Sequence, residues 1–184
     1  MNFDPINNAE LLLIRKALAS RFGREVQCEY LTISDTYTAP HDGVLDIWLQ
    51  GGSPSGPASG GGGYLSGSGA PEISIKSVEV KAGDQFVTAL GAGGLPVTVA
   101  ASVLANGIDG GTSSVVGPGV NMTAVGGKAG KASATVPVLG GEGGHGGQGG
   151  DEHRPGGDGG DVLAATTNAS AGSGACNVRG LPKA

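Results

Sequence analysis

Residues 140–150 read Gly-Gly-Glu-Gly-Gly-His-Gly-Gly-Gln-Gly-Gly, and residues 156–161 resume the pattern as Gly-Gly-Asp-Gly-Gly-Asp. The repeat of three matches neither the 3.6-residue turn of an α-helix nor the two-residue repeat of a strand. It is typical of the extended left-handed helix that has three residues per turn and no internal hydrogen bonds. Every third side chain then lies along one edge, and the bare edges let neighbouring backbones bond to one another. We expect rods that pack side by side.

The side chains on the decorated edge of the first run are Glu142, His145 and Gln148. Residues 151–155 (Asp-Glu-His-Arg-Pro) interrupt the triplets, so we expect a loop between two rods. Several charged or titratable side chains at one loop tip could hydrogen-bond a ligand, and a plain solvated turn is the alternative. The candidate contact residues in this part of the chain are His145, Gln148, Glu152, His153 and Arg154.

Composition limits what this chain can be. Glycine supplies 38 of the 184 residues, and aromatic residues make up only 4%. Because glycine loses more conformational freedom on folding than any other residue, the fold must recover that cost through dense backbone hydrogen bonding, a small apolar core and contacts with other chains. The net charge of −5 leaves no basic stripe, which argues against a nucleic-acid partner.

Other functional classes lack their signatures. No apolar run reaches the roughly 18–20 residues of a membrane span, and no signal-peptide pattern opens the chain, so we expect synthesis in a cytosol. No serine lies in a nucleophile elbow, and no glycine-rich loop has the context of a phosphate-binding motif. We therefore expect neither an enzyme nor a cofactor.

Residues 8–22 are predicted to form the only helix. Asn7 suits the N-cap and Glu10 follows three residues later, as in a capping box. Gly23 can end the helix. Because an isolated helix of about 15 residues is marginal in water, its apolar stripe must dock, either on its own domain or on a neighbouring protein as an assembly handle. The stripe consists of Leu11, Ile14, Leu18 and Phe22.

Alternating apolar residues predict short strands in the remaining sequence. We expect them at Val26–Tyr30, 44–50, 73–80, 85–90, 97–103, 112–116, 120–125 and 132–138. The pattern changes phase within 73–80, which predicts a bulge near Lys76 and Ser77. Residues 51–69 are predicted to be a long glycine-rich loop that carries Tyr64. We expect Trp48 to be buried, because large apolar groups are scarce.

The predicted fold is mainly β: a glycine-rich β-sandwich with polyglycine-II-like triplet segments, preceded by one N-terminal α-helix. We expect two parts, an attachment segment over residues 1–38 and a glycine-rich β domain over residues 39–184.

An ordered series of motifs runs over roughly residues 39–161. It comprises Gly43-Val44-Leu45-Asp46-Ile47-Trp48-Leu49, the loop 51–69, Lys81-Ala82-Gly83-Asp84, Gly91-Ala92-Gly93-Gly94, Gly110-Gly111-Thr112-Ser113-Ser114, Ala124-Val125-Gly126-Gly127 and the closing triplets. This order resembles the glycine-rich domain of bacteriophage tail fibre, tail-tip and baseplate proteins. It is similar to the polyglycine-sandwich adhesins at the tips of T-even-like long tail fibres.

The resemblance implies a virion tail component, made in the host bacterial cytoplasm, that attaches to the host surface. Its implied partners are other tail or baseplate proteins and a host glycan or outer-membrane protein. Fibre analogy implies a homo-oligomer, with a trimer as the guess. The candidate receptor-binding residues are then Tyr64, His145, Gln148, Glu152, His153 and Arg154, and the candidate assembly interface is the stripe of the helix over residues 8–22.

Two alternatives stay open. The first is a purely structural tail or baseplate connector that never meets a receptor. The second is a calcium-binding, glycine-rich secreted adhesin, because residues 156–164 fit one copy of the nonapeptide of calcium-binding β-rolls. Asp158 and Asp161 would then bind the ion, although such rolls need several tandem copies.

Overall fold

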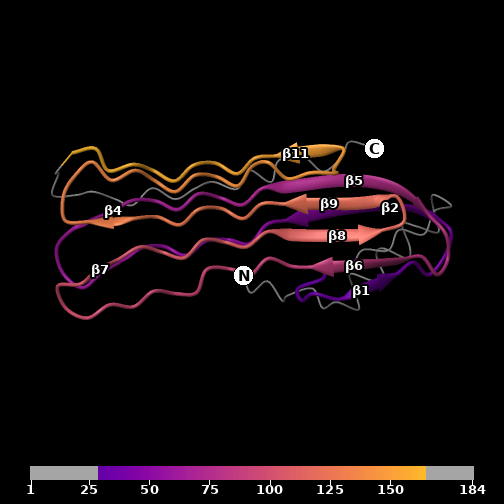
Figure 1. Cartoon of the computed structure of the whole chain (residues 1–184), viewed down its shortest axis with the longest axis horizontal. Helices are drawn as coiled ribbons and strands as arrows, with labels where there is room; N and C mark the ends of the chain where they lie inside the picture. Colours follow the sequence, from indigo (N-terminus) through magenta and orange to yellow (C-terminus); the bar gives the residue numbers. More distant parts are fainter. Residues whose placement is uncertain (1–28, 165–184) are drawn as a thin grey trace, which may run out of the picture. The chain divides into compact units, whose positions relative to one another are not determined.

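The computed structural model describes residues 29–164 (Figure 1). The chain divides into two units, residues 1–32 and 33–184, and all the elements below belong to the second. The helix expected at 8–22, its stripe (Leu11, Ile14, Leu18 and Phe22) and the strand residues Val26 and Cys28 lie outside the described residues.

The described part of the chain consists of strands and extended segments and contains no helix. The fold is therefore mainly β, in several sheets, as the sequence predicts. The strands are β1 (Thr36–Thr38), β2 (Gly43–Gln50), β3 (Ala58–Ser59), β4 (Tyr64–Leu65), β5 (Ile73–Val80), β6 (Gln85–Ala89), β7 (Leu104–Ala105), β8 (Ser113–Gly117), β9 (Val120–Ala124), β10 (Ala132–Ser133) and β11 (Glu152–Arg154).

The longer strands form two antiparallel sheets with the orders β1-β6-β8-β9 and β11-β5-β2. Leu49 and Val80 of the second sheet share a buried cluster with Phe86, Val115 and Met122 of the first. The sheets therefore face each other across a small core, and Phe86 is the largest side chain in it. Away from the core, β4 pairs with β10 and β3 with β7.

The strand predicted at 44–50 is confirmed, but the bulge predicted near Lys76 and Ser77 is wrong. β5 pairs with β2 without interruption from Val80 opposite Gly43 to Ile73 opposite Gln50. The phase change has another cause: Ser74 takes a position on the core face, while Ile73 and Ile75 lie on the outer face. A second apolar surface therefore covers the outside of this sheet.

Three further predictions need correction. Residues 97–103 form no strand, and pairing begins only at Leu104. Residues 151–155 were expected to be a loop, but Glu152–Arg154 form β11 at the edge of β5. Residues 51–69 are not a free loop, because most of them run extended against distant segments and contribute β3 and β4.

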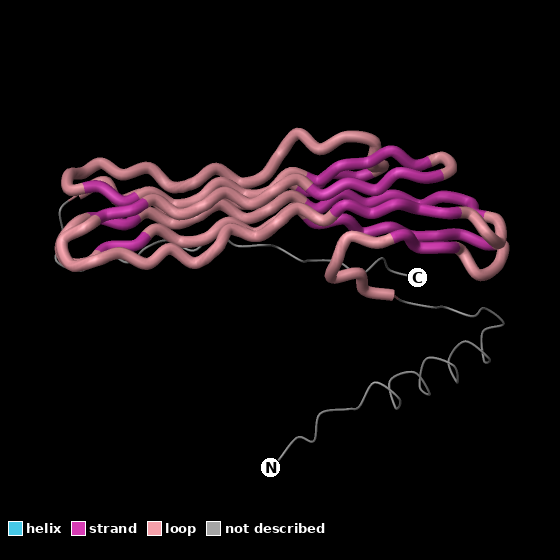
Figure 2. The backbone as a smooth tube through the Cα atoms, turned by 60° about the horizontal axis from the view of Figure 1, so that its bottom comes forward, coloured by secondary structure: helices cyan, strands magenta, loops and turns pink. Residues whose placement is uncertain are grey.

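Most passages of the chain continue past the strands as extended segments, which we call rods (Figure 2). Hydrogen bonds between rods step by three residues on both partners, whereas a strand ladder repeats every two. The rod 66–72 donates to an antiparallel neighbour through Ser66–Lys131, Gly69–Lys128 and Glu72–Val125 at 2.9 Å each. It accepts from a parallel neighbour through Gly141–Gly67 and Gly144–Ala70 at 2.8 Å each. The lattice thus combines both chain directions.

Glycine is required where rods touch. A Cβ atom placed on Gly69 would meet the carbonyl group of Glu142, and one on Gly156 would meet that of Ala70. The carbonyl of Lys128 similarly occupies the place of a side chain at Gly141. These contacts are with backbone, which cannot move aside without breaking the lattice.

Replacing Gly69 by alanine tests this packing. We expect Gly69→Ala to lower the unfolding free energy by about 1–3 kcal/mol, the usual cost of overpacking. That corresponds to a drop in Tm of roughly 2–4 °C per kcal/mol. The matched control is Gly56→Ala, since a Cβ at Gly56 meets nothing within 4 Å. Thermal melts in which both variants keep the parent Tm would contradict the rod geometry.

Candidate functional site

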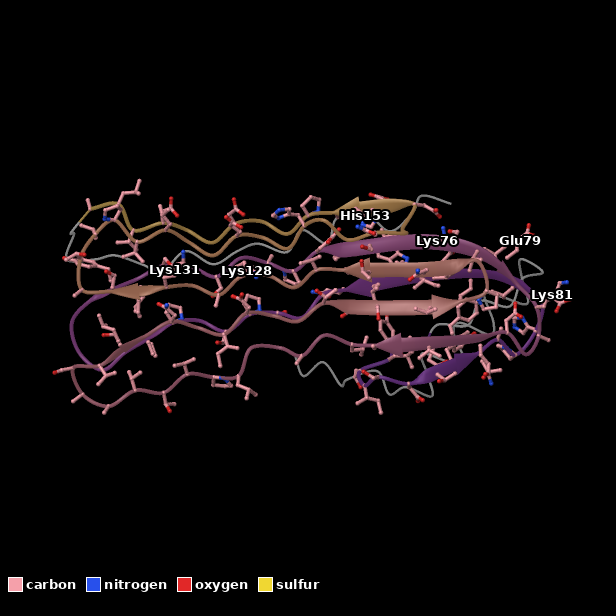
Figure 3. All side chains as sticks on the ribbon, viewed as in Figure 1. Lys76, Glu79, Lys81, Lys128, Lys131 and His153 are labelled. Carbon is pink, nitrogen blue, oxygen red and sulfur yellow. The ribbon has the colours of Figure 1, made fainter. Side chains whose placement is uncertain are left out.

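Three of the candidate residues lie together on β11, which pairs with β5 so that Glu152 lies opposite Ile75, His153 opposite Ser74 and Arg154 opposite Ile73. Because side chains alternate along a strand, His153 faces inward with Ser74. Glu152 and Arg154 share the outer face. Figure 3 shows His153 and Lys76 in this part of the molecule and Lys131 farther along the rods, near β4.

His153 belongs to a polar cluster that the sequence did not reveal. Its Nδ1 lies 3.0 Å from Oε1 of Glu72 and 2.9 Å from Oγ of Ser74. Glu72 is only 1% exposed, and its Oε2 accepts hydrogen bonds from the backbone N–H groups of Val125 at 3.1 Å and Gly147 at 2.9 Å. A buried carboxylate is tolerated when donors surround it in this way.

Proton positions in the cluster follow from its donors. Oγ of Ser74 has one proton and donates it to the Thr123 carbonyl at 2.8 Å. Because its proton is used in this way, the Oγ of Ser74 accepts a hydrogen bond from Nδ1 of His153. The same Nδ1–H group also donates to Oε1 of Glu72. A serine nucleophile needs the opposite ring nitrogen of its histidine as base, whereas here serine and carboxylate share one nitrogen. The cluster is consequently a structural clamp between β5, β11 and the rods.

The outer face of the same sheet carries an exposed aromatic group. Trp48 is 42% exposed, so the expectation that it would be buried is wrong. It lies opposite Ile75, and Cζ of Arg154 lies 5.6 Å from its ring centroid, within range of a cation–π contact. Arg154 Nε donates to Glu152 at 2.6 Å, which lowers the pKa of Glu152 and raises that of Arg154.

Asp151 fastens β11 to β5 from the solvent side. The backbone N–H of Ser77 donates to its Oδ2 at 3.1 Å, and Nζ of Lys76 donates to its Oδ1 at 3.0 Å. These two bonds, that of Ser77 first, lower the pKa of Asp151 below its ordinary value of 3.8. The carboxylate is therefore the form that holds the strand.

The decorated edge of the triplets is exposed. Glu142, His145 and Gln148 all face solvent. Nδ1 of His145 donates to the Gly143 carbonyl at 3.0 Å, which leaves Nε2 pointing away from that bond. We call these three side chains, together with the exposed Glu152 and the half-buried Arg154, the polar margin.

The two aspartates of the possible calcium motif make bonds to the backbone. Oδ1 of Asp158 accepts from the N–H of Gly143, and Oδ1 of Asp161 accepts from that of Gly140, both at 2.7 Å. Among the described residues, no group of three or more His, Cys, Asp or Glu side chains is placed to hold a metal ion. The aspartates act here as acceptors for an adjacent rod.

Tyr64 lies apart from the other candidate residues. It belongs to β4, pairs with Ser133 of β10 and is half-buried. Figure 1 places β4 and β7 at the far end of the rods from β11 and the two larger sheets. Between residues 29 and 164, no helix is long and apolar enough to cross a bilayer.

Comparisons with known proteins identify no family. No model of a protein family matches the chain, and a search of curated proteins found no significant match.

The clamp around Glu72 predicts a stability effect. We expect Glu72→Gln to lower the unfolding free energy by about 1.5–3 kcal/mol, because hydrogen bonds to a charged group are lost and an amide N–H₂ faces other donors. Glu79→Gln is the control, since Glu79 is exposed on β5, the strand that Glu72 immediately precedes. Urea denaturation measures both variants, and an equal effect at the two positions would contradict a clamp at Glu72.

Asp151 predicts a pH effect. Because its pKa is lowered in the folded state, its stabilisation is fully present above the ordinary value and is lost as the pH falls through the lower folded value. We therefore expect the Tm advantage of the parent over Asp151→Asn to be constant above about pH 5 and to shrink below about pH 4. An advantage that grows on acidification would contradict this assignment.

Proposed function

We propose that the protein is a bacteriophage tail component, in a tail fibre, tail tip or baseplate, that attaches the virion to the host-cell surface. One observation carries this proposal: a hydrogen-bonded array of rods holds three chain reversals together, far from the two larger sheets. A stiff scaffold that presents loops is what surface recognition needs, because binding residues commonly lie on loops that a rigid framework positions.

We also propose that the rods are polyglycine-II-like helices. Two features support this assignment: hydrogen bonds that step by three residues, and neighbours that run in both directions. The resemblance to glycine-rich phage adhesins rests on the same part of the chain. Together they favour a virion protein over a free linker, which would make no such bonds.

The reversals at the far end of the rods are residues 60–63, 100–103 and 134–137. β1 pairs with β6 at the opposite end of the molecule, where the two larger sheets lie (Figure 1). The chain therefore enters the rods from the end that carries the sheets. If residues 1–38 hold the protein on the virion, the far reversals and the adjacent Tyr64 are free to meet a receptor. The polar margin of His145, Gln148, Glu152 and Arg154 is a lateral contact surface in this arrangement, and His153 supports it from beneath.

Repetition strengthens such a contact. Several copies around a tail would bind a host glycan or outer-membrane protein with an avidity well above that of one loop. The expected partners on the virion are other tail or baseplate proteins, which the apolar stripe of residues 8–22 would engage.

The two alternatives make different predictions. A structural connector would use the far reversals for no contact with the host. A calcium-binding adhesin would lose structure with a chelator, and the engagement of Asp158 and Asp161 with backbone amides favours the phage assignment over it.

Insertion of a short bulky peptide between Gly61 and Gly62 tests receptor contact. Gly62 has φ +71°, and a Cβ placed there meets nothing within 4 Å, so the insertion should leave the rods intact. We expect binding of purified protein to cells of the susceptible strain to fall about tenfold or more, as for the loss of a central contact.

The control is the same insertion between Pro118 and Gly119. Gly119 has φ +69° and lies with Pro118 in the exposed turn between β8 and β9, at the strand end of the molecule. The two proteins should melt alike, and only the first should bind poorly. Full binding by both, in particles that assemble normally, would favour the connector.

A further inference from the structure

One rod lacks the bonds that all its neighbours make. Within the described part of the chain, the C=O groups of residues 95–99 and the N–H groups of Leu95, Val97, Thr98 and Val99 take part in no hydrogen bond, and Pro96 has no N–H. The run is tied down only at its ends, by Gly94 donating to Ser53 at 2.8 Å and by Val103 donating to Ala100 at 3.2 Å. It therefore forms an open edge of the lattice.

The neighbouring rod explains why the run stays unbonded on its inner side. Residues 94–100 lie beside residues 53–60, since a Cβ on Gly93 would approach the Ser53 carbonyl and one on Gly60 the Ala100 carbonyl. That neighbour contains Pro54 and Pro57, which have no N–H to donate. The backbone groups of 95–99 must find partners elsewhere.

Elsewhere in the lattice, side chains accept amides that no backbone carbonyl accepts. Backbone amides left over by the rods donate to polar side chains at 2.7–2.9 Å: Gly140 to Asp161, Gly143 to Asp158, Ala129 to Asp109, Ile108 to Ser55 and Ala132 to Asn106. No side chain supplies such an acceptor to residues 95–99. The contrast marks this edge as different from the others.

The side chains at the open edge are uncharged and, apart from the exposed Thr98, apolar. Leu95 is 71% exposed, and Val103 and Ile108 of the adjoining segments are 46% and 48% exposed. No charged residue occurs between Asp84 and Asp109. Natural proteins usually protect an edge with charges or proline, and Pro96 is the one such residue between Asp84 and Asp109. Exposed apolar side chains at an edge indicate an interaction site.

We propose that residues 95–101 pair with the same run of a second copy of this chain, about a two-fold axis. A two-fold interface brings one surface against itself, so that each copy supplies both donors and acceptors. The rods already accept antiparallel neighbours, which is the direction imposed by a two-fold axis perpendicular to the rods. A protein of net charge −5 repels itself, and residues 85–108 are an uncharged surface where two copies can meet.

This inference is independent of host attachment. It differs from the trimer that fibre analogy implies. When the edge of one copy pairs with the same edge of a second copy, no open edge is left for a third. A partner with a charged surface fits this edge less well, since the edge offers no countercharge.

The experiment measures the mass of the full-length protein by light scattering across a concentration series. We expect a dimer that dissociates on dilution. Leu95→Lys should raise the dissociation constant about tenfold or more, because it places two like charges at the interface. Leu139→Lys is the matched control, since Leu139 is 56% exposed on another rod, and it should leave the dissociation constant within about twofold.

Thr98→Pro supplies a second variant. Proline removes one amide donor, and its fixed φ suits an extended left-handed rod, so the fold should persist while dimerisation weakens. Hydrogen exchange of residues 97–101 should slow as the protein concentration rises.

Three results would overturn the proposal: a monomer at every concentration, a trimer whose stability ignores Leu95→Lys, or slow exchange of these amides in the monomer. The last would mean that another segment of the same chain covers the edge.

Discussion

The structure depends on the absence of side chains where rod meets rod. At Gly69 and Gly156, a carbonyl group of the neighbouring rod occupies the space that a Cβ atom would need. Each backbone hydrogen bond so formed contributes only about 0.5–1.5 kcal/mol net, and each ordered glycine costs more entropy than another residue would. The lattice is consequently stable as a cooperative array, and the core around Phe86 and Met122 anchors one end of it.

The hydrogen bonds of the strands repeat every two residues and those of the rods every three. Buried polar side chains lie where a strand continues into a rod. Glu72 immediately precedes β5, and its carboxylate accepts from Val125, which immediately follows β9. Ser113 begins β8, and its Oγ accepts from Gly91 and donates to the Gln50 carbonyl, the last residue of β2. A backbone that changes from a two-residue to a three-residue repeat leaves some groups unmatched, and these side chains satisfy them. Buried polar side chains in this fold therefore join two kinds of secondary structure.

The sequence predicted the features that local patterns encode. The strands at 44–50 and 120–125 and the turn at 81–84 follow from neighbouring residues alone. It could not predict the clamp of Glu72, Ser74 and His153, since these residues contact across more than 75 positions of sequence. Trp48 was misplaced because scarcity of apolar groups suggested burial, whereas Ile73, Ile75 and Arg154 give it an outer surface to pack on. Residues 51–69 lack a strict triplet, so their rod partners were visible only in three dimensions.

A lattice of rods always has outer rods with unpaired backbone groups. A barrel closes because its last strand meets its first, but rods that bond in several directions always leave outer edges. Among the described residues, several amides that no backbone carbonyl accepts donate to single side-chain oxygen atoms of an adjacent rod, such as those of Asp158 and Asp161. The same device gives a role to the polar residues of the second triplet run, since Asp158 and Asp161 accept the amides of Gly143 and Gly140. Glu142, His145 and Gln148 of the first run face solvent instead. Where the sequence instead places leucine and valine beside unbonded amides, at residues 95–99, the lattice is complete only when another rod is added.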